Sequence, residues 1–506
     1  MLESASPIRA DSHGPISSKP MAVHLITLGC ARNEVDSSEL AASLDSGGFR
    51  LVDDPHEADA VMVNTCGFIE TAKKDSIDTL LAASDLKKAA KATAVVAVGC
   101  LAERYGRELA ESLPEADAVL GFDDYAEVAD RLRAILSGQR HQAHVPRDRR
   151  ALLPLAPTAR PAVAKAVTIP GHQAVARSGR GPASGPRVFR RRLDDSPSAP
   201  LKIASGCDRR CTFCAIPTFR GAYVSRLPAE IVAEASWLVE RGVRELFLVS
   251  ENSTSYGKDL GDMRALERLL VELAGIDGLS WIRVSYLQPA EVRPSLIEAM
   301  ASTPKVVPYF DLSFQHASPR VLRRMRRFGS AESFLGLISS IRRLAPTAGI
   351  RSNVICGFPG ETEADVDLLC EFLGQADLDA IGVFGYSAEE GTEALRLDGQ
   401  HPPEEIEARR ARVADLADEL ISQRAASRIG ERVQVLVEEA AQQIIGRAAH
   451  QGPEVDGNVA LISLAPLRCG DLVDAVVSDS AGVDLVATTI VDQQQTPIGL
   501  QELRSP

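Results

Sequence analysis

One short loop of the chain reads Ser205-Gly206-Cys207-Asp208-Arg209-Arg210-Cys211-Thr212-Phe213-Cys214. Its three cysteines have the spacing C-x3-C-x2-C, and the loop follows an apolar stretch at residues 201–204 that predicts a strand. Iron–sulfur clusters normally take four cysteines, so three thiolates leave one iron of a cubane open for a substrate. A structural zinc ion is the main alternative, but it requires a fourth ligand, and no His and no further Cys lies nearby in the sequence. The spacing therefore favours an iron–sulfur cluster.

Residues 200–428 around this loop alternate between strand and helix signals. Such repeats are typical of an α/β fold and predict an open (β/α)6 barrel, whose functional residues lie at the carboxyl ends of the strands. The three-cysteine loop follows the first strand and so lies at that end. A charged helix over about residues 404–423 leads out of the barrel. The six predicted strands are residues 201–204, 245–249, 281–285, 309–314, 350–355 and 380–384.

Residues 21–138 show a second alternation, which predicts a flavodoxin-like parallel sheet with strands at residues 23–28, 60–63 and 94–98. Each strand is followed by a cysteine. In an open parallel sheet the strand ends share one edge, so the three thiols could meet there and bind a second metal centre. Taken singly, each is equally typical of a buried core residue, and the spacing leaves both interpretations open. The three cysteines are Cys30, Cys66 and Cys100.

The other segments have different compositions. Residues 1–20 are polar and predict a disordered tail, and residues 429–506 show the period-two alternation of a small β-barrel. Residues 139–199 are rich in Pro, Ala, Arg and Gly, which predicts a linker without a core. From 139 to 200 the chain has 12 Lys and Arg against 3 Asp. We interpret this segment as a solvated spacer, with a weak arm for ribosomal RNA as the alternative.

The whole chain of 506 residues has a formal net charge of -13, so it is not built to coat nucleic acid or an anionic membrane. No apolar run of about eighteen residues occurs, which predicts no membrane span. The first twenty residues lack the apolar stretch of a signal peptide. Nine cysteines in a chain of this size indicate reduced thiols and a cytoplasmic setting.

The cysteine loop resembles the radical S-adenosylmethionine superfamily. With both cysteine sets, the chain resembles the methylthiotransferase family, in which an N-terminal methylthiotransferase domain precedes the barrel and a TRAM β-barrel follows it. The resemblance covers nearly everything except the tail and the linker. It rests on Gly29-Cys30, Asn64-Thr65-Cys66-Gly67-Phe68-Ile69, Gly99-Cys100-Leu101-Ala102, Arg220-Gly221 and Gly357-Phe358-Pro359-Gly360-Glu361-Thr362.

Within that family the chain is similar to the branch that modifies an aspartate of the small-subunit ribosomal protein S-twelve. Residues 64–69, 315–319 and 453–457 carry this similarity. Residues 431–506 contain 4 Arg and 11 Asp and Glu, which suits a basic protein partner better than RNA, unless the acids only solubilise the domain. The alternatives are a transfer RNA adenosine methylthiotransferase and a non-catalytic iron–sulfur protein that binds ribosomes.

The resemblance implies a transferase that adds a methylthio group to the β-carbon of the aspartate, with S-adenosylmethionine as radical source and methyl donor. It implies two 4Fe-4S clusters, the first on the cysteines of the N-terminal domain and the second, which binds S-adenosylmethionine, on the barrel loop. It also implies an electron donor, and ribosomal protein S-twelve as partner, free or in the small subunit. Unactivated C–H bonds require such a cofactor.

Further residues are candidates with weaker signals. Ser250-Glu251-Asn252 stands where the family usually has Ser-Gln-Asp, in a region that the resemblance implies contacts S-adenosylmethionine, so the family's contacts do not carry over residue by residue. Two acids in a Pro-Gly-bounded turn, Glu454 and Asp456, are predicted to be exposed and to dock the substrate. Cys356, Cys370 and Cys469 are interpreted as ordinary thiols. The predicted cofactor-binding residues, each with a structural role as the alternative, are Glu251, Arg283, Gln315, Arg351, Gly357 and Gly360.

Overall fold

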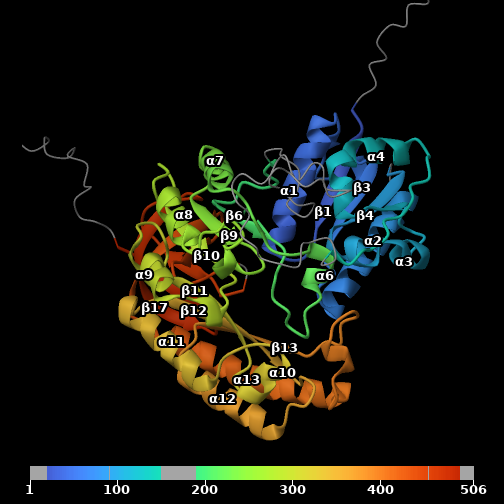
Figure 1. The fold of residues 1–506 in the computed structure, drawn as a ribbon. Helices are drawn as coiled ribbons and strands as arrows, with labels where there is room; N and C mark the ends of the chain where they lie inside the picture. The colour runs from blue at the N-terminus through green and yellow to red at the C-terminus, as the bar shows by residue number, and fades with distance from the viewer. Residues whose placement is uncertain (1–19, 90–91, 150–189, 454, 491–506) are drawn as a thin grey trace, which may run out of the picture.

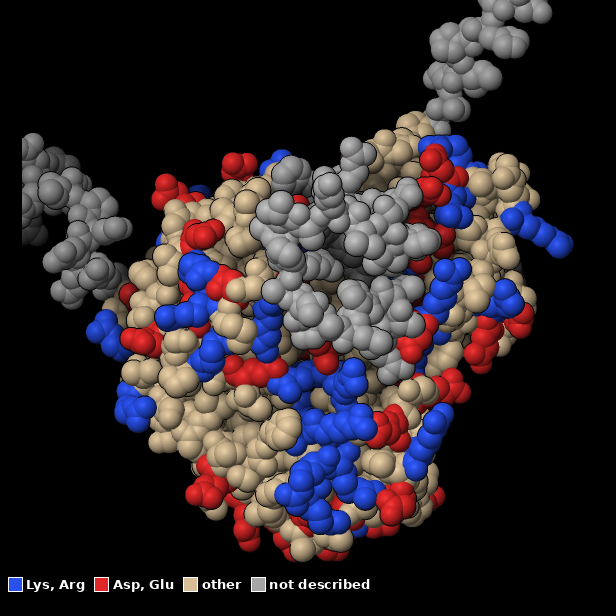
Figure 2. Space-filling model, in the orientation of Figure 1, with Lys and Arg blue, Asp and Glu red and all other residues tan. Residues whose placement is uncertain are grey.

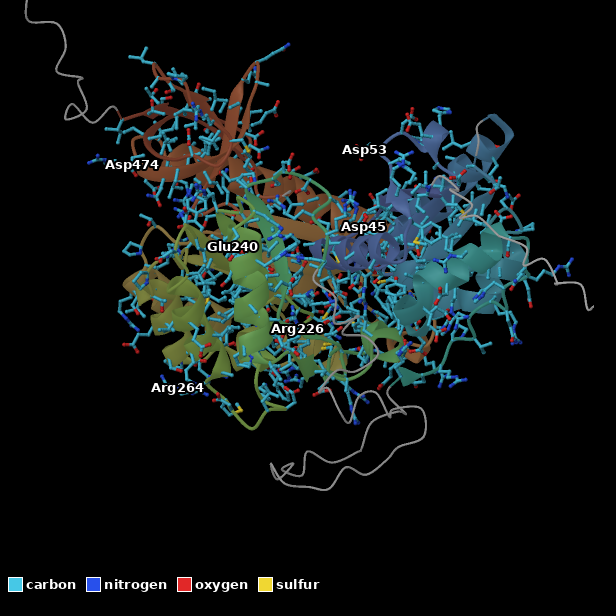
Figure 3. The ribbon with its side chains drawn as sticks, turned by 90° about the horizontal axis from the view of Figure 1, so that it is seen from above. Asp45, Asp53, Arg226, Glu240, Arg264 and Asp474 are labelled. Atoms are coloured by element: carbon cyan, nitrogen blue, oxygen red, sulfur yellow. The ribbon has the colours of Figure 1, made fainter. Side chains whose placement is uncertain are left out.

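The computed structural model describes residues 20–89, 92–149, 190–453 and 455–490, which form three domains (Figure 1). The predicted tail, most of the predicted linker and Glu454 lie outside the described residues. Within the described ranges, none of the helices has the length and apolar character needed to cross a membrane. Seen from above, the labelled Asp53 of the N-terminal domain and Asp474 of the C-terminal domain lie in separate lobes (Figure 3).

The N-terminal domain is a five-stranded parallel sheet in the order β2-β1-β3-β4-β5, which is the flavodoxin-like order. The three predicted strands are present as β1 (Ala22–Thr27), β3 (Ala60–Thr65) and β4 (Ala94–Val98). The edge strands β2 (Arg50–Leu51) and β5 (Ala118–Val119) were not predicted, because two residues are too few to show a period.

Helices cover both faces of this sheet. On one face, α1 and α4 pack their apolar side chains against β3 and β4, and on the other face α2 and α3 do so. The valines of β3 and β4 are buried on both faces, as expected for a central parallel strand. The four helices are α1 (Ala31–Ser46), α2 (Glu70–Ala89), α3 (Gly99–Ser112) and α4 (Val128–Leu136).

The central domain is the predicted open barrel. Two three-stranded sheets, β10-β9-β6 and β11-β12-β13, are joined by bridges between Ile282 and Val306 and between Leu287 and Leu312. All six predicted strands are present, so the (β/α)6 prediction is confirmed. The strands are β6 (Ser198–Lys202), β9 (Glu245–Val249), β10 (Trp281–Val284), β11 (Tyr309–Gln315), β12 (Gly349–Cys356) and β13 (Ala380–Gly385).

Helices on the outside of the barrel enclose the main hydrophobic core with the strands. The helix α7 begins at Pro228, where the absent N–H costs nothing because first-turn amides have no partner inside a helix. The long helix α13 (Pro403–Ser427) packs on β13 and leads to the C-terminal domain (Figure 1). The other helices are α7 (Pro228–Val239), α8 (Ala265–Ala274), α9 (Pro294–Ser302), α10 (Pro319–Arg324), α11 (Ala331–Leu344) and α12 (Glu363–Ala376).

The C-terminal domain is a closed five-stranded barrel in the order β14-β15-β16-β18-β17. Alternate side chains such as Val433, Val435 and Val437 point into its core, which explains the period-two pattern of the sequence. The strands β16 and β18 pair in parallel and the other neighbours pair antiparallel. The strands are β14 (Arg432–Ala440), β15 (Ile444–Ala448), β16 (Val459–Ile462), β17 (Leu472–Ala481) and β18 (Asp484–Thr489).

The ends of the predicted linker pack against the domains that they join. Arg149 is buried and its Nε lies 2.7 Å from Glu103 of α3. Arg190 is buried as well, with its Nε 3.1 Å from Glu234 of α7. The side chains of these arginines therefore have defined partners, although the composition around them is that of a solvated spacer.

Candidate functional site

The barrel cysteine loop lies between β7 (Ala204–Ser205) and α6 (Ile216–Arg220), at the carboxyl end of β6. Backbone hydrogen bonds hold both sides of it, with Cys207 N donating to Gly221 O at 3.1 Å and Thr212 N donating to Met325 O at 3.2 Å. The second bond ties the loop to the turn after α10. Because the loop is anchored twice, its three thiols have a defined arrangement.

The thiols of this loop are close neighbours. Burial raises the pKa of Cys207 to about 11, and the adjacent Cys211 adds to the rise. Burial raises the pKa of Cys214 further still, with Cys211 and Cys207 both contributing. Buried thiols of this kind ionise only when a cation compensates their charge, and iron in a cluster does so. The loop chemistry therefore fits an iron–sulfur cluster held by Cys207, Cys211 and Cys214.

The structure also brings Cys30, Cys66 and Cys100 together at one edge of the N-terminal sheet. A side chain at Gly29 would lie 3.1 Å from the Cys66 Sγ, so the Gly29-Cys30 turn lies directly over Cys66. Burial raises the pKa of Cys66 to about 11, and the nearby Cys100 and Cys30 add to this rise. Three thiols from three separate strand ends thus lie near one another, and of the three only Cys100 is buried.

Neither set fits a single metal ion. Among the described residues, no three His, Cys, Asp or Glu side chains are close enough to hold one ion. In a 4Fe-4S cube each thiolate binds a different iron, so its ligands stand further apart than those of one zinc ion. The spacing, and the presence of three thiols where structural zinc takes four ligands, therefore fit clusters better than zinc.

Two predicted cofactor residues lie at the same end of the barrel as the cysteine loop. Gln315 ends β11 with a φ of 70°, a conformation rare for a residue with a side chain, and it is half-buried. Glu251 follows β9, and its buried carboxylate forms an ion pair with Arg32 of α1. Gln315 remains a cofactor candidate, whereas the Glu251 side chain is already used to join the two domains.

Arg283 and Arg351 face the C-terminal domain instead. The Arg283 side chain is 0% exposed, and its Nε lies 2.7 Å from Glu245 at the start of β9. Its Nη1 donates to Ala449 O at 2.8 Å, so the described partners of Arg283 belong to the protein, and its cofactor contact stays a prediction. Arg351 has its Nε 3.4 Å from Asp456, so its partner is a carboxylate of the C-terminal domain. Arg351 is the third of eight residues of β12, and the Arg283 guanidinium reaches Glu245, the first residue of β9. Both guanidinium groups therefore lie toward the end of the barrel opposite the cysteine loop.

Asp456 is buried, with 4% of its surface exposed, so the prediction of an exposed docking acid is wrong. Its carboxylate accepts hydrogen bonds from Tyr309 Oη at 2.5 Å and from Gly452 N at 2.9 Å. A Pro-Gly turn is usually solvated, but here the turn inserts against the barrel, where Tyr309 and Arg351 supply partners. Its neighbour Glu454 lies outside the described residues.

The glycines of the Gly357–Thr362 motif have protein neighbours. Gly357 has a φ of 73°, and a side chain there would lie 2.8 Å from Ile406 of α13. A side chain at Gly360 would lie 2.9 Å from the Arg324 guanidinium. Close packing therefore explains both glycines without a cofactor, as the structural alternative proposed.

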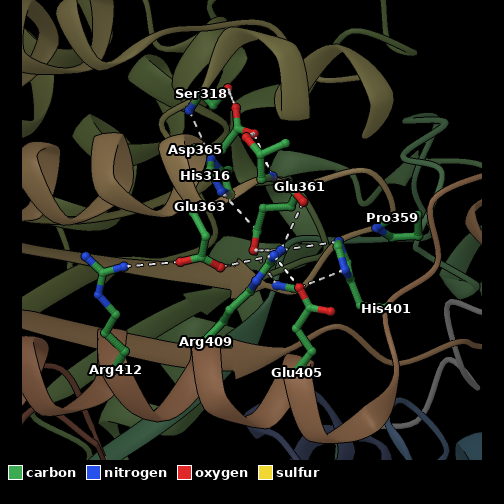
Figure 4. Close-up of polar contacts among 12 residues, drawn as sticks. His316, Ser318, Pro359, Glu361, Glu363, Asp365, His401, Glu405, Arg409 and Arg412 are labelled. Atoms are coloured by element: carbon green, nitrogen blue, oxygen red, sulfur yellow. Dashed lines mark hydrogen bonds and ion pairs between the residues drawn. The ribbon is translucent and has the colours of Figure 1, made fainter.

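The same motif organises a buried polar network that sequence reasoning missed (Figure 4). Glu361 Oε2 lies 3.2 Å from His316 Nε2, and Glu361 Oε1 accepts from Gly357 N at 2.9 Å. Arg409 of α13 donates to Glu361 Oε1 at 3.2 Å. Because Glu361 serves three partners, it fixes α13 against the strand ends of β11 and β12. The motif was recognised in the sequence, but the partner from α13 lies 48 residues away.

Three ion pairs and their neighbours hold the N-terminal domain on the barrel. Lys202 Nζ lies 3.1 Å from Asp36, and Arg104 Nη1 lies 2.8 Å from Glu389, with all four side chains at most 6% exposed. With the Arg32 pair, these contacts place the edge of the parallel sheet against the carboxyl end of the barrel. The two cysteine sets therefore face one shared region, although they lie in different domains.

This architecture defines a radical S-adenosylmethionine protein. Residues 201–373 match the model of the Radical SAM superfamily. Residues 22–121 match Uncharacterized protein family UPF0004, and residues 429–490 match the TRAM domain. The solved structure of the radical S-adenosylmethionine methyltransferase TsrM from Kitasatospora setae is similar in fold, with a TM-score of 0.50 and 16% identity over 72% of each chain.

Relatives over nearly the whole chain narrow this class. The ribosomal protein uS12 methylthiotransferase RimO of Cutibacterium acnes is 65% identical over 92% of this chain and 98% of its own length. The RimO of Kineococcus radiotolerans is 61% identical over 94% and 99%, and that of Streptomyces coelicolor is 59% identical over 93% and 97%. The chain belongs to the ribosomal protein uS12 methylthiotransferase RimO family.

Proposed function

We propose that this chain is a radical S-adenosylmethionine methylthiotransferase whose substrate is ribosomal protein uS12. The observation that carries this proposal is the identity of 59–65% to uS12 methylthiotransferases over all three domains. The reaction adds a methylthio group to the β-carbon of an aspartate of uS12. No side-chain base removes a proton from such a carbon, and the chain therefore needs a cofactor.

Two 4Fe-4S clusters are part of the proposal. The first is held by Cys30, Cys66 and Cys100, and the second by the barrel loop with Cys207, Cys211 and Cys214. When bound, the barrel cluster with S-adenosylmethionine supplies the radical that breaks an unactivated C–H bond. An external protein or small molecule must supply the electron. The support from this chain is that each set offers three thiols, the first at the ends of three parallel strands and the second in one loop at the carboxyl end of β6.

Buried ion pairs around the two cysteine sets hold these sets in position and exclude water. The pairs of Lys202 with Asp36 and of Arg32 with Glu251 are nearly inaccessible to solvent, so they hold the domains in one relative position. Gln315, at the strand end next to the loop, is positioned to bind the cofactor or the substrate. Fixed geometry of this kind lowers the entropic cost of bringing two reactants together.

Cysteine replacement tests the two clusters. In anaerobically reconstituted protein, replacing Cys207, Cys211 and Cys214 by Ala roughly halves iron and sulfide and abolishes S-adenosylmethionine cleavage, because each cluster holds about four irons. Replacing Cys30, Cys66 and Cys100 halves iron but leaves cleavage intact. Cys370→Ala is the matched control, because this half-buried thiol belongs to neither set, and it leaves both readouts unchanged. Wild-type protein with only about four irons would contradict the first cluster.

Mass spectrometry of ribosomal proteins and transfer RNA from a strain that lacks the protein tests the substrate. We expect loss of the methylthio group from uS12 and unchanged transfer RNA. The reverse result would favour the transfer RNA adenosine reaction on the same scaffold. Absence of S-adenosylmethionine cleavage in reconstituted protein would favour the non-catalytic alternative.

The C-terminal domain is proposed to dock the basic substrate protein through its exposed acids. Asp474, labelled in Figure 3, and Asp479 take this role in place of Asp456, because the side chains of both are exposed on β17. Changing both to Lys raises the apparent KM for uS12 and leaves S-adenosylmethionine cleavage unchanged, since rim charges act mainly on association. The defect shrinks as salt rises. An unchanged KM at low salt would contradict this docking surface.

A weak contact of the linker with ribosomal RNA is the alternative to a solvated spacer, and the linker lies largely outside the described residues. Among described residues, Figure 2 shows Lys and Arg gathered over α10, in a chain whose net charge is negative. Arg320, Arg323 and Arg326 are exposed there, and Phe328 beside them is 73% exposed, which suits phosphates and a stacked base. Arg323→Glu then slows modification of uS12 in small subunits and not of free uS12. Equal slowing on both would contradict this contact.

A further inference from the structure

Arg220 belongs to the barrel domain by sequence, six residues after Cys214, but its guanidinium lies in the cysteine site of the N-terminal domain. Its Nη2 donates to Cys100 Sγ at 3.1 Å and to Asn33 Oδ1 at 3.2 Å. Its Nη1 lies 2.8 Å from Asp36 Oδ2. One side chain from the end of α6 therefore contacts a cysteine, an amide and a carboxylate of the other domain.

The surroundings fix the position of this guanidinium. The ring of Phe122 lies against it, with 4.4 Å between the guanidinium carbon and the ring centroid. Asn33 is itself held, since its Nδ2 donates to Leu28 O at 2.7 Å and to Thr65 O at 3.2 Å. The Arg220 side chain is 4% exposed, so water does not compete for these contacts. The hydrogen bond to Cys100 is thus part of a preorganised arrangement.

The charge of this arginine acts directly on Cys100. Burial raises the pKa of the Cys100 thiol, and Arg220 is the group that most strongly opposes the rise. Asp36 neutralises Arg220 only in part, because its carboxylate is shared with Lys202 at 3.1 Å. A buried cation close to a cysteine sulfur stabilises the reduced, more negative state of a cluster bound to that sulfur. Hydrogen bonds to cysteine sulfur raise the reduction potentials of iron–sulfur clusters for this reason.

We propose that Arg220 is a positioning residue whose hydrogen bond to Cys100 raises the reduction potential of the cluster on Cys30, Cys66 and Cys100. The inference rests on the two-cluster function proposed above. Because α6 directly follows the barrel cysteine loop, the barrel domain sets the potential of the cluster in its neighbour. The N-terminal cluster therefore reaches its working potential only when the two domains are docked.

The test uses the full chain with Cys207, Cys211 and Cys214 replaced by Ala, so that only the N-terminal cluster remains. Arg220→Gln removes the charge, and Arg220→Lys keeps it with fewer donors. The readout is the midpoint potential from a redox titration followed by electron paramagnetic resonance. We expect full iron content in both variants and a potential that falls from Arg through Lys to Gln.

Arg104→Gln is the matched control, because Arg104 also joins the N-terminal domain to the barrel, through Glu389, while no contact with a cysteine is described for it. The midpoint potential of the Arg104→Gln variant is expected to equal that of the parent, which is the chain with the three barrel cysteines replaced by Ala. A potential unchanged in Arg220→Gln at full iron content would overturn the inference and leave the proposed function standing. Loss of iron in both Arg220 variants would overturn it in favour of a structural role. A parent that binds no cluster would instead contradict the two-cluster proposal.

Discussion

Glu245 is the buried carboxylate that joins the barrel to the C-terminal domain, and we predict that Glu245→Gln weakens this junction severely. Its Oε1 accepts from Arg283 Nε at 2.7 Å, and its Oε2 accepts from Arg447 Nη2 of β15. The three side chains are at most 2% exposed. Glutamine keeps the volume but loses the charge, and its amide turns one N–H toward an arginine. Arg283 then has no carboxylate partner among the described residues, and Arg447 keeps only Glu438.

Two independent arguments give the magnitude. Removing one partner of a buried ion pair costs about 3–5 kcal/mol. Burial alone would raise the pKa of Glu245 above its usual 4.5, but Arg283 and Arg447 outweigh it and lower the pKa to about 2. A difference of this size corresponds to about 3 kcal/mol of stability. This stability is present above the unfolded pKa and is lost as the pH falls toward the folded pKa.

Trp281 reports on this junction, because it lies at the interface and its Nε1 donates to Gln434 Oε1 of β14 at 3.2 Å. The chain has 2 Trp, so Trp237→Phe makes Trp281 the only fluorescent indole. In this background, Glu245→Gln lowers the urea midpoint of the Trp281 transition by about 1 M or more. The midpoint difference between variant and parent shrinks toward pH 2, where Glu245 titrates.

Glu438→Gln is the control, because Glu438 pairs with the same Arg447, at 2.7 Å, but is 26% exposed. Its loss leaves Arg447 paired with Glu245 and costs about 0–1 kcal/mol. Equal midpoints for Glu245→Gln and Glu438→Gln would refute the reasoning, because burial would then add nothing to the cost of an unpaired arginine.

Three further predictions follow from other parts of the chain. Replacing residues 150–189 by a Gly/Ser segment of equal length retains the iron content and S-adenosylmethionine cleavage, because the composition of the native segment supports no core. Loss of iron in this variant would show that the segment has a structural role. Glu389→Gln removes the shared partner of Lys73 and Arg104 and increases hydrogen exchange where the N-terminal domain meets the barrel. Unchanged exchange would mean that these ion pairs do not hold the two domains together. His450 is buried neutral, with burial first and Arg428 second lowering its pKa from 6.5 to about 3. Because only the unfolded chain protonates this imidazole between pH 6.5 and 3, His450 destabilises the fold by up to about 5 kcal/mol over that range. Calorimetry of His450→Gln therefore shows a smaller loss of stability than the wild type as the pH falls. An equal loss in both proteins would mean that the imidazole is protonated in the fold.

The cysteine positions could be predicted because they depend on strand ends. Apolar runs mark the strands, and parallel strands in one sheet end at one edge, so the sequence indicates that Cys30, Cys66 and Cys100 could meet there, with three separate core residues as the alternative. The two-residue strands β2 and β5 could not be predicted, because they have no period and exist only through pairing with β1 and β4. Arg220 lay inside a recognised motif, but nothing local indicated that it reaches Cys100.

Local pattern alone determined the three-domain order, the parallel sheet, the six-stranded barrel and the two cysteine sets, because hydrophobic periodicity and loop spacing act over a few residues. Only the tertiary structure decided which polar side chains serve the site and which serve the domain junctions. Arg283 finds its carbonyl partner 166 residues away, and Tyr309 finds Asp456 147 residues away. A buried charge must have a partner, and the partner is supplied by whichever domain docks there, which no local pattern records.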